Sequence, residues 1–200
     1  PTVDAGPDQT GNEGDLLSFS GSLFDPGTAD THTIEWDYGD GTFDSGTLTP
    51  THAFGDNGVF IVRLTITDDD GCVGSDTLIV TIDNVAPIAD AGPDQTVDEG
   101  DTVVFAGSII DPGSADTHTI LWDFGDGSTD SGSLTPTHVY TDDDLYTVTL
   151  SVTDDGESHS DTMMVTVLNV APTAVTDGPY NGDEGSPITI SGAGSFDPGL

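Results

Sequence analysis

Residues 24–41 have the sequence FDPGTADTHTIEWDYGDG, and nearly the same sequence returns at residues 110–127 as IDPGSADTHTILWDFGDG. In both copies an apolar side chain recurs at every second position through and past the tryptophan, as Ile34, Trp36 and Tyr38 and as Ile120, Trp122 and Phe124, a period of two that is typical of a β-strand with one buried face. A Gly-Asp-Gly turn closes each copy. The sequence therefore predicts a repeated β-structure in which Trp36 and Trp122 face a core.

The similarity extends outward from these stretches and describes a tandem array. Residues 1–86 begin with PTVDAGPDQT, residues 87–171 begin with PIADAGPDQT, and most aligned positions are identical. A more divergent third copy begins at residue 172 and stops within the pattern. A repeat of about 85 residues can hold a core of its own. We expect two complete domains, 1–86 and 87–171, and the truncated start of a third over 172–200, in an excerpt of a longer protein.

The clearest alternation lies in two strands near the end of each repeat. The expected inward side chains are Phe60, Val62, Leu64, Ile66, Leu78, Val80 and Ile82 in the first repeat, and Tyr146, Val148, Leu150, Val152, Met163, Val165 and Val167 in the second. About seven short strands per repeat, with a tryptophan on the third, are typical of an immunoglobulin-type sandwich. The predicted fold class is all-β, with tandem immunoglobulin-like β-sandwiches.

The composition excludes several classes of partner. The chain has 37 acidic residues against one basic residue, Arg63, for a formal charge of −36. Nucleic acids and anionic membranes both need clustered Lys and Arg, so we expect neither partner. No segment approaches the roughly 20 apolar residues of a membrane-spanning helix, so we expect no membrane insertion in this segment. Cys72 is the only cysteine, which excludes an internal disulfide.

The sequence offers no catalytic set. The five histidines are His32, His52, His118, His138 and His159, and they form no local three-ligand zinc group. No nucleophile-elbow motif accompanies the abundant Ser and Asp. Paired carboxylates alone do not make a hydrolase, because such a site also needs a concave pocket and an acid of raised pKa. We therefore expect no enzyme activity and no catalytic residues in this chain.

The motifs resemble one known family. WDYGDG at 36–41 and WDFGDG at 122–127 are followed by PTHAF and PTHVY, and then by VRLTITDDDG and VTLSVTDDG. Together they are similar to the polycystic kidney disease (PKD) domain, and the resemblance covers both complete repeats. It implies an immunoglobulin-like sandwich that occurs in tandem in extracellular and cell-surface proteins, and beside secreted microbial proteases and polysaccharide-degrading enzymes.

Acidic loops predict a cation site. In a sandwich of this topology, the loop after the second strand, the loop after the sixth and the entering linker lie at one end. The residues in these places are Asp25, Asp68 and Asp69 in the first repeat, and Asn84, Asp111, Asp154 and Asp155 in the second. Carboxylate and amide oxygens suit calcium. The resemblance implies calcium at the second set, because some PKD domains of secreted proteases bind it at this end. The alternative is that the loops only hold turns and keep the chain soluble.

Two functions remain open. The first is a non-catalytic extracellular or cell-surface array that acts as a spacer, display or adhesion module and is rigidified by calcium. Its partners would be neighbouring repeats of the same chain, with a polysaccharide or a cell-surface protein as the ligand for adhesion. The second is a carbohydrate- or protein-binding accessory module of a secreted hydrolase. An exposed row of aromatic residues would favour the second, whereas most aromatic residues here alternate inward.

Overall fold

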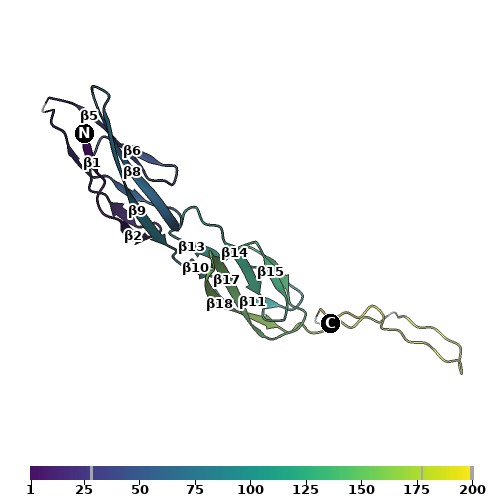
Figure 1. The fold of residues 1–200 in the computed structure, drawn as a ribbon. Coiled ribbons are helices and arrows are strands. Elements are labelled where there is room, and N and C mark those ends of the chain that lie inside the picture. Colours follow the sequence, from purple (N-terminus) through teal and green to yellow (C-terminus); the bar gives the residue numbers. More distant parts are fainter. Residues whose placement is uncertain (28, 177, 199–200) are drawn as a thin grey trace. The chain divides into compact units, whose positions relative to one another are not determined.

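The computed structural model describes residues 1–27, 29–176 and 178–198, and the regular structure in these ranges is entirely β-strand (Figure 1). This confirms the predicted fold class of tandem immunoglobulin-like β-sandwiches. None of the described residues forms a helix long and apolar enough to cross a membrane.

Among the described residues, the first repeat contains nine strand segments. These are β1 (Thr2–Asp4), β2 (Gln9–Asn12), β3 (Leu16–Ser18), β4 (Ser22–Phe24), β5 (His32–Asp37), β6 (Phe43–Ser45), β7 (Thr51–Ala53), β8 (Gly58–Asp68) and β9 (Val73–Asp83). A five-stranded sheet has the order β2-β9-β8-β5-β6, and the pairs β1-β4 and β3-β7 supply the other side of the core.

The second repeat has the same plan. Its strands are β10 (Ile88–Asp90), β11 (Gln95–Asp98), β12 (Thr102–Val104), β13 (Ser108–Ile110), β14 (Thr119–Asp123), β15 (Thr129–Ser131), β16 (Thr137–Val139), β17 (Leu145–Asp154) and β18 (Glu157–Leu168). The five-stranded sheet has the order β11-β18-β17-β14-β15, beside the pairs β10-β13 and β12-β16. The repeated sequence therefore produces a repeated topology.

The segments are more numerous than the expected seven or so, because the first strands change layer. β1 pairs antiparallel with β4, whereas β2 pairs parallel with β9 in the five-stranded sheet. Gly6 between them has φ 92°, a left-handed conformation that glycine adopts without strain. Its N–H donates to Asp4 Oδ1 (2.8 Å). Gly92 and Asp90 repeat this turn before β11.

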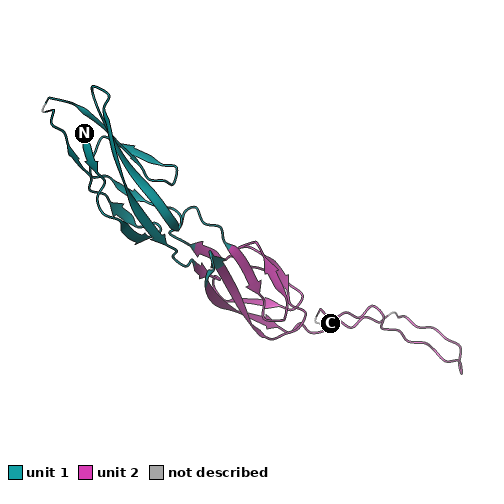
Figure 2. Ribbon diagram, in the orientation of Figure 1, with its two compact units in different colours: residues 1–87, 110–118, 153–158 teal, residues 88–109, 119–152, 159–200 magenta. Residues whose placement is uncertain are grey.

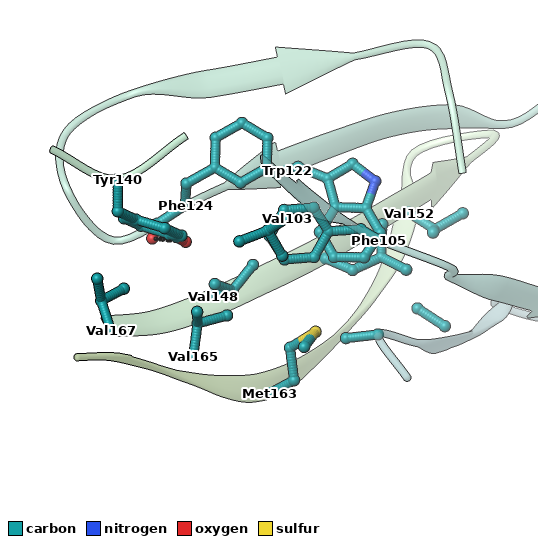
Figure 3. Close-up of a cluster of buried hydrophobic side chains, with 13 residues drawn as sticks. Val103, Phe105, Trp122, Phe124, Tyr140, Val148, Val152, Met163, Val165 and Val167 are labelled. Carbon is teal, nitrogen blue, oxygen red and sulfur yellow. Dashed lines mark hydrogen bonds between the residues drawn. The ribbon is translucent and has the colours of Figure 1, made fainter. Parts of the chain in front are cut away.

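The cores confirm the predicted alternation. Trp36 and Trp122 are both 0 % exposed, and the inward residues of β8, β9, β17 and β18 are buried apart from the partly buried rings of Phe60 and Tyr146. Figure 3 shows the second core, where Trp122 lies beside Phe105 with ring centroids 5.2 Å apart. The indole Nε1 of Trp122 donates to Ser133 O (3.0 Å), so its polar atom is satisfied inside the core.

The chain forms two compact units (Figure 2). The first comprises residues 1–87 together with the loops 110–118 and 153–158. The second comprises 88–109, 119–152 and 159–200. The domain boundaries at 86 and 171 stay predictions. Within the predicted third copy, residues 177, 199 and 200 lie outside the described residues, and the rest contains an isolated Thr173–Phe196 bridge and no strand.

Candidate metal centre

Four carboxylates converge within the first compact unit. Glu13 lies in the turn after β2, Asp111 and Asp116 lie in the loop between β13 and β14, and Asp154 ends β17. One oxygen from each lies within 4.8 Å of the others. All four residues belong to the first unit, which contains the loops 110–118 and 153–158. The fold thus brings together acids that are up to 141 residues apart (154 − 13).

Burial distinguishes this cluster from ordinary surface acids. Glu13 and Asp154 are each 1 % exposed. Glu13 Oε2, Asp116 Oδ2 and Asp154 Oδ1 are buried and have no hydrogen-bond partner. A buried carboxylate oxygen without a partner is costly, and several together are more so. The cluster therefore provides three buried oxygens that a cation, a proton or a water molecule could satisfy.

Asn84 adds an amide to the same cluster. Its side chain follows β9 and lies 3.1 Å from both Asp154 Oδ2 and Glu13 Oε1. With its nitrogen turned toward these two acceptors, the amide donates to both of them. Without a cation the nitrogen-inward orientation is favoured, whereas a cation between the carboxylates favours the oxygen-inward one. The orientation of Asn84 is therefore a reporter of metal binding.

The pKa values of three of these acids are raised, because burial and mutual repulsion disfavour their charged forms. Burial first, and then the charges of Glu13, Asp154 and Asp111, together raise the pKa of Asp116 to about 7. Burial also raises the pKa of Glu13, although the hydrogen bond from the Val85 N–H opposes it. The pKa of Asp154 rises through burial first and then through the charge of Asp111. Without a cation, Asp116 therefore binds a proton at a pH close to neutral.

The structure separates the seven residues that the sequence proposed as ligands. Asn84, Asp111 and Asp154 lie together in the cluster just described. Asp25 and Asp68 meet in a different group with Asp30. Asp25 is paired there, with its Oδ2 3.0 Å from His32 Nε2 and 3.4 Å from the Pro1 ammonium. Asp111 has the equivalent contact in the first cluster, where its Oδ2 lies 2.7 Å from His118 Nε2. The His32 hydrogen bond is the main reason that the pKa of Asp25 falls to about 2.

Asp69 and Asp155 lie outside both groups. Asp69 Oδ1 accepts from the Thr31 N–H (3.1 Å), which holds the loop before β5. Asp155 is exposed and has φ 39° in the turn between β17 and β18. Asp69 and Asp155 therefore belong to turns and to neither group, although each is adjacent in sequence to an acid that does belong to one.

Glu13 and Asp116 are the two acids of the first cluster that the sequence did not suggest. Glu13 lies in an Asn-Glu-Gly-Asp stretch that has the composition of a simple turn, and burial of a glutamate is not visible from composition. Asp116 lies in the Ala-Asp-Thr-His-Thr connection. The available signal was repetition, because both acids recur in the other repeat, as Glu99 and Asp30.

The second unit contains a related group. Glu99, which is 4 % exposed, lies close to Asp142 and Asp143. Glu99 Oε1 accepts from the Val170 N–H (2.7 Å), as Glu13 Oε1 accepts from the Val85 N–H (2.6 Å). A buried glutamate that holds the backbone after the last strand is thus common to both repeats.

The histidine–aspartate pairs are structural. His52 Nε2 lies 2.7 Å from Asp40 Oδ2 and 3.4 Å from Thr42 Oγ1, and its ring stacks on Tyr38. His138, Asp126 and Ser128 repeat the arrangement in the second repeat. The same ring nitrogen contacts both the acid and the hydroxyl, so the three groups do not form a nucleophile–base–acid relay. Both histidines thus pack against an aromatic ring and hydrogen-bond to an aspartate.

Comparison with known proteins identifies sequence relatives. The model of the PKD domain family matches residues 1–82 and 84–167. The pre-pro-metalloprotease PrtV of Vibrio cholerae serotype O1 is 37 % identical over 98 residues, which are 48 % of this chain and 10 % of PrtV. The chain therefore spans about a tenth of the length of the curated relatives that it matches.

Solved structures give a similar result. The crystal structure of the PKD1 domain of the Vibrio cholerae metalloprotease PrtV is 33 % identical, covers 42 % of this chain and 98 % of that domain, and has a TM-score of 0.33. The four N-terminal immunoglobulin domains of Dscam1 isoform 7.44 are 16 % identical, with 80 % of this chain and 43 % of that chain covered and a TM-score of 0.50. The Dscam1 similarity shows the immunoglobulin-like fold alone.

Proposed function

The chain belongs to the PKD domain family, and from this premise we propose that it is a non-catalytic extracellular accessory segment that spaces or displays other domains and is stiffened by calcium. The observation that carries the proposal is the buried cluster of Glu13, Asp111, Asp116 and Asp154 with the Asn84 amide. PKD domains occur in the metalloprotease PrtV, which supports an accessory role beside other domains.

The donor set is suited to calcium. Calcium takes six to eight oxygen ligands at flexible geometry, and carboxylates and amide carbonyls are its usual ligands. Four carboxylates and one amide oxygen supply much of that shell, and a carboxylate can bind through both oxygens. The cluster contains neither sulfur nor imidazole as a ligand, which disfavours zinc and copper.

Calcium would stiffen the chain because the ligands come from distant segments. An ion held by Glu13, Asn84 and Asp154 would connect the turn after β2, the segment after β9 and the end of β17. Extracellular modules bind calcium at roughly 0.1 to 1 mM, which fits a segment that works outside the cell. The sugar-binding alternative lacks comparable support, because both tryptophans are fully buried.

Thermal unfolding tests the proposal. A calcium concentration of about a hundred times Kd would add about 2.7 kcal/mol to the free energy of unfolding. The melting temperature of the first unit should then rise by about 10 °C or more over the value in chelator. The double variant Asp111→Asn with Asp154→Asn should lose this rise, because two of the ligands are neutralised.

A matched variant provides the control. Asp69→Asn with Asp155→Asn removes the same number of charges next to the clusters, from residues that lie outside them. This variant should keep the calcium response. Magnesium at equal ionic strength should do much less, because it demands a smaller octahedral site. If magnesium or sodium chloride raises the melting temperature as much as calcium does, the stabilisation is only non-specific screening of the acidic loops, and the proposal is wrong.

A further inference from the structure

Two turns at one end of the first repeat form a common surface. Gly14 follows β2, Gly55 follows β7, and the Gly14 N–H donates to Phe54 O (2.8 Å), which joins the two turns. The first compact unit contains these turns together with the loop between β13 and β14 (Figure 2). We call Gly14 and Gly55 the glycine pair, and residues 111–116 of that loop the docking loop.

The docking loop meets both glycines. A Cβ at Gly14 would lie 2.8 Å from Pro112 Cβ and 2.9 Å from Pro112 O. A Cβ at Gly55 would lie 2.5 Å from Ser114 Oγ. The Ala115 N–H donates to Gly55 O (2.8 Å). The absence of a side chain at glycine is what permits so close an approach between two segments.

Gly55 is glycine because of the docking loop and not because of its own backbone. Gly14 has φ 74°, a conformation that favours glycine in any case, whereas Gly55 is not one of the glycines with positive φ. The second repeat has Thr141 at the position of Gly55, in the same turn after β16. The sandwich therefore accepts a larger residue there, and the nearest atom that such a residue would meet belongs to the docking loop.

The contact between glycine and proline recurs in the second unit. Gly100 has φ 82°, and its N–H donates to Tyr140 O (2.9 Å), as that of Gly14 donates to Phe54 O. A Cβ at Gly100 would lie 3.1 Å from Pro198 Cβ. Pro198 stands in the Asp-Pro-Gly motif of the third copy. In both units, the glycine after the buried glutamate of one repeat thus meets the proline of the next Asp-Pro-Gly motif.

The first repeat provides a matched loop without this contact. Its residues 25–30 have the sequence DPGTAD, against DPGSAD in the docking loop. Gly113 is buried, whereas the equivalent Gly27 is half-buried. Among the described residues, the Ala29 N–H has no backbone partner, whereas the equivalent Ala115 N–H has Gly55 O. Two nearly identical loops therefore differ in what covers them.

We propose that the docking loop attaches the second repeat to the first by direct contact with the glycine pair, and that this attachment does not need calcium. The contacts are one backbone hydrogen bond and two close approaches, none of which involves a carboxylate. They act against the mutual repulsion of Glu13 and the acids of the docking loop. The partner of each such loop is the repeat that precedes it in the chain.

Docking has a second consequence, which rests on the calcium site proposed above. Asp111 and Asp116 both belong to the docking loop, and Glu13 is adjacent to Gly14. A docked loop holds these carboxylates close together before an ion arrives, so less ordering is needed when it binds. The glycine pair should therefore strengthen calcium binding although it provides no ligand.

Amide hydrogen exchange of the whole chain in chelator, resolved by residue with NMR, tests the docking. The Ala115 amide should exchange roughly fivefold or more slowly than the Ala29 amide, because their neighbours are nearly identical and only Ala115 donates to Gly55 O. Gly55→Thr, which installs the residue of the second repeat, should abolish this difference. Unchanged protection of the core amides on β8 and β17 verifies that this variant is folded.

A second pair of variants provides an independent test. Ala115→Pro removes the donor N–H, so the Ser114 and Asp116 amides should exchange faster in chelator. Ala29→Pro is the matched control in the first repeat and should leave the docking loop unchanged. In a calcium titration, Gly55→Thr should raise Kd roughly fivefold, because the ion must then order the loop itself.

The outcomes separate docking from calcium binding. If the Ala115 amide exchanges as fast as that of Ala29 in chelator, or is slowed only by added calcium, the glycine pair does not hold the loop and the proposal is wrong. Unchanged Ala115 protection in Gly55→Thr contradicts it as well. A chain that shows the expected difference in chelator but binds no calcium supports the docking and refutes the calcium function instead.

Discussion

Trp122→Ala is expected to unfold the second sandwich at a much lower temperature than the unaltered chain. The side chain is 0 % exposed, lies against Phe105 and donates its indole hydrogen to Ser133 O. Replacing a buried tryptophan with alanine costs about 3 to 5 kcal/mol, because the lost contacts leave a cavity. In a domain of this size, that corresponds to a decrease in melting temperature of about 15 to 30 °C.

Calorimetry and tryptophan fluorescence together measure this effect. Trp36 is the only other tryptophan, so fluorescence of Trp122→Ala reports on the first core alone. Trp36→Ala reverses the roles and serves as the reciprocal variant. Gly107→Ala tests the same core by overpacking it and not by leaving a cavity. Its Cβ would come within 2.8 Å of Trp122 Cζ2 and Leu150 Cδ2, so this variant should also be less stable. A loss below about 1 kcal/mol for Trp122→Ala would show that the indole is not central to the core.

In chelator, the first unit is expected to be more stable at pH 5 than at pH 8. The pKa of Asp116 rises from 3.8 to about 7 in the folded chain, and those of Glu13 and Asp154 rise as well. Between the unfolded and folded values, the folded state binds more protons than the unfolded one. Stability is therefore highest at the acidic end of this range and falls as the pH rises through 7, by about 2 kcal/mol.

Calcium should reverse this dependence. The ion competes with protons for the same oxygens, so its affinity rises as the carboxylates lose their protons. The difference in melting temperature between calcium and chelator should widen from pH 5 to pH 8. The single variant Asp116→Asn should flatten the slope measured in chelator. An equal calcium effect at both pH values would mean that the ion binds away from the buried carboxylates. The range avoids the acid-side titration of Asp25, whose pKa is about 2.

The sequence predicted the sandwiches well because their signals are local. Alternation along β8 and β17 specifies which side chains are buried, and the repeated tryptophan indicates where each core lies. The extra strand segments were not predicted, because the change of layer between β1 and β2 depends on the left-handed Gly6 and on pairing with β9. Such pairing joins residues about 70 positions apart, which no local pattern reveals.

The candidate metal centre was predicted in part for the same reason. Topology places the loops of Asp111 and Asp154 near the linker of Asn84, and the structure brings these three together. Glu13 was missed because a glutamate in a turn is normally solvated, and only tertiary packing buries it. Asp155 was included because it follows Asp154, although adjacent residues at a strand end point in different directions.

A crystal structure of the chain grown with about 5 mM calcium tests the central claim most directly, since that concentration exceeds the usual affinity of extracellular sites. The account predicts one strong anomalous peak among Glu13, Asp111, Asp116 and Asp154, with oxygen distances of about 2.3 to 2.6 Å. Asn84 should turn its amide oxygen toward the ion. A cluster that binds no ion at this concentration, with the Asn84 nitrogen donating to Glu13 and Asp154, would contradict the account.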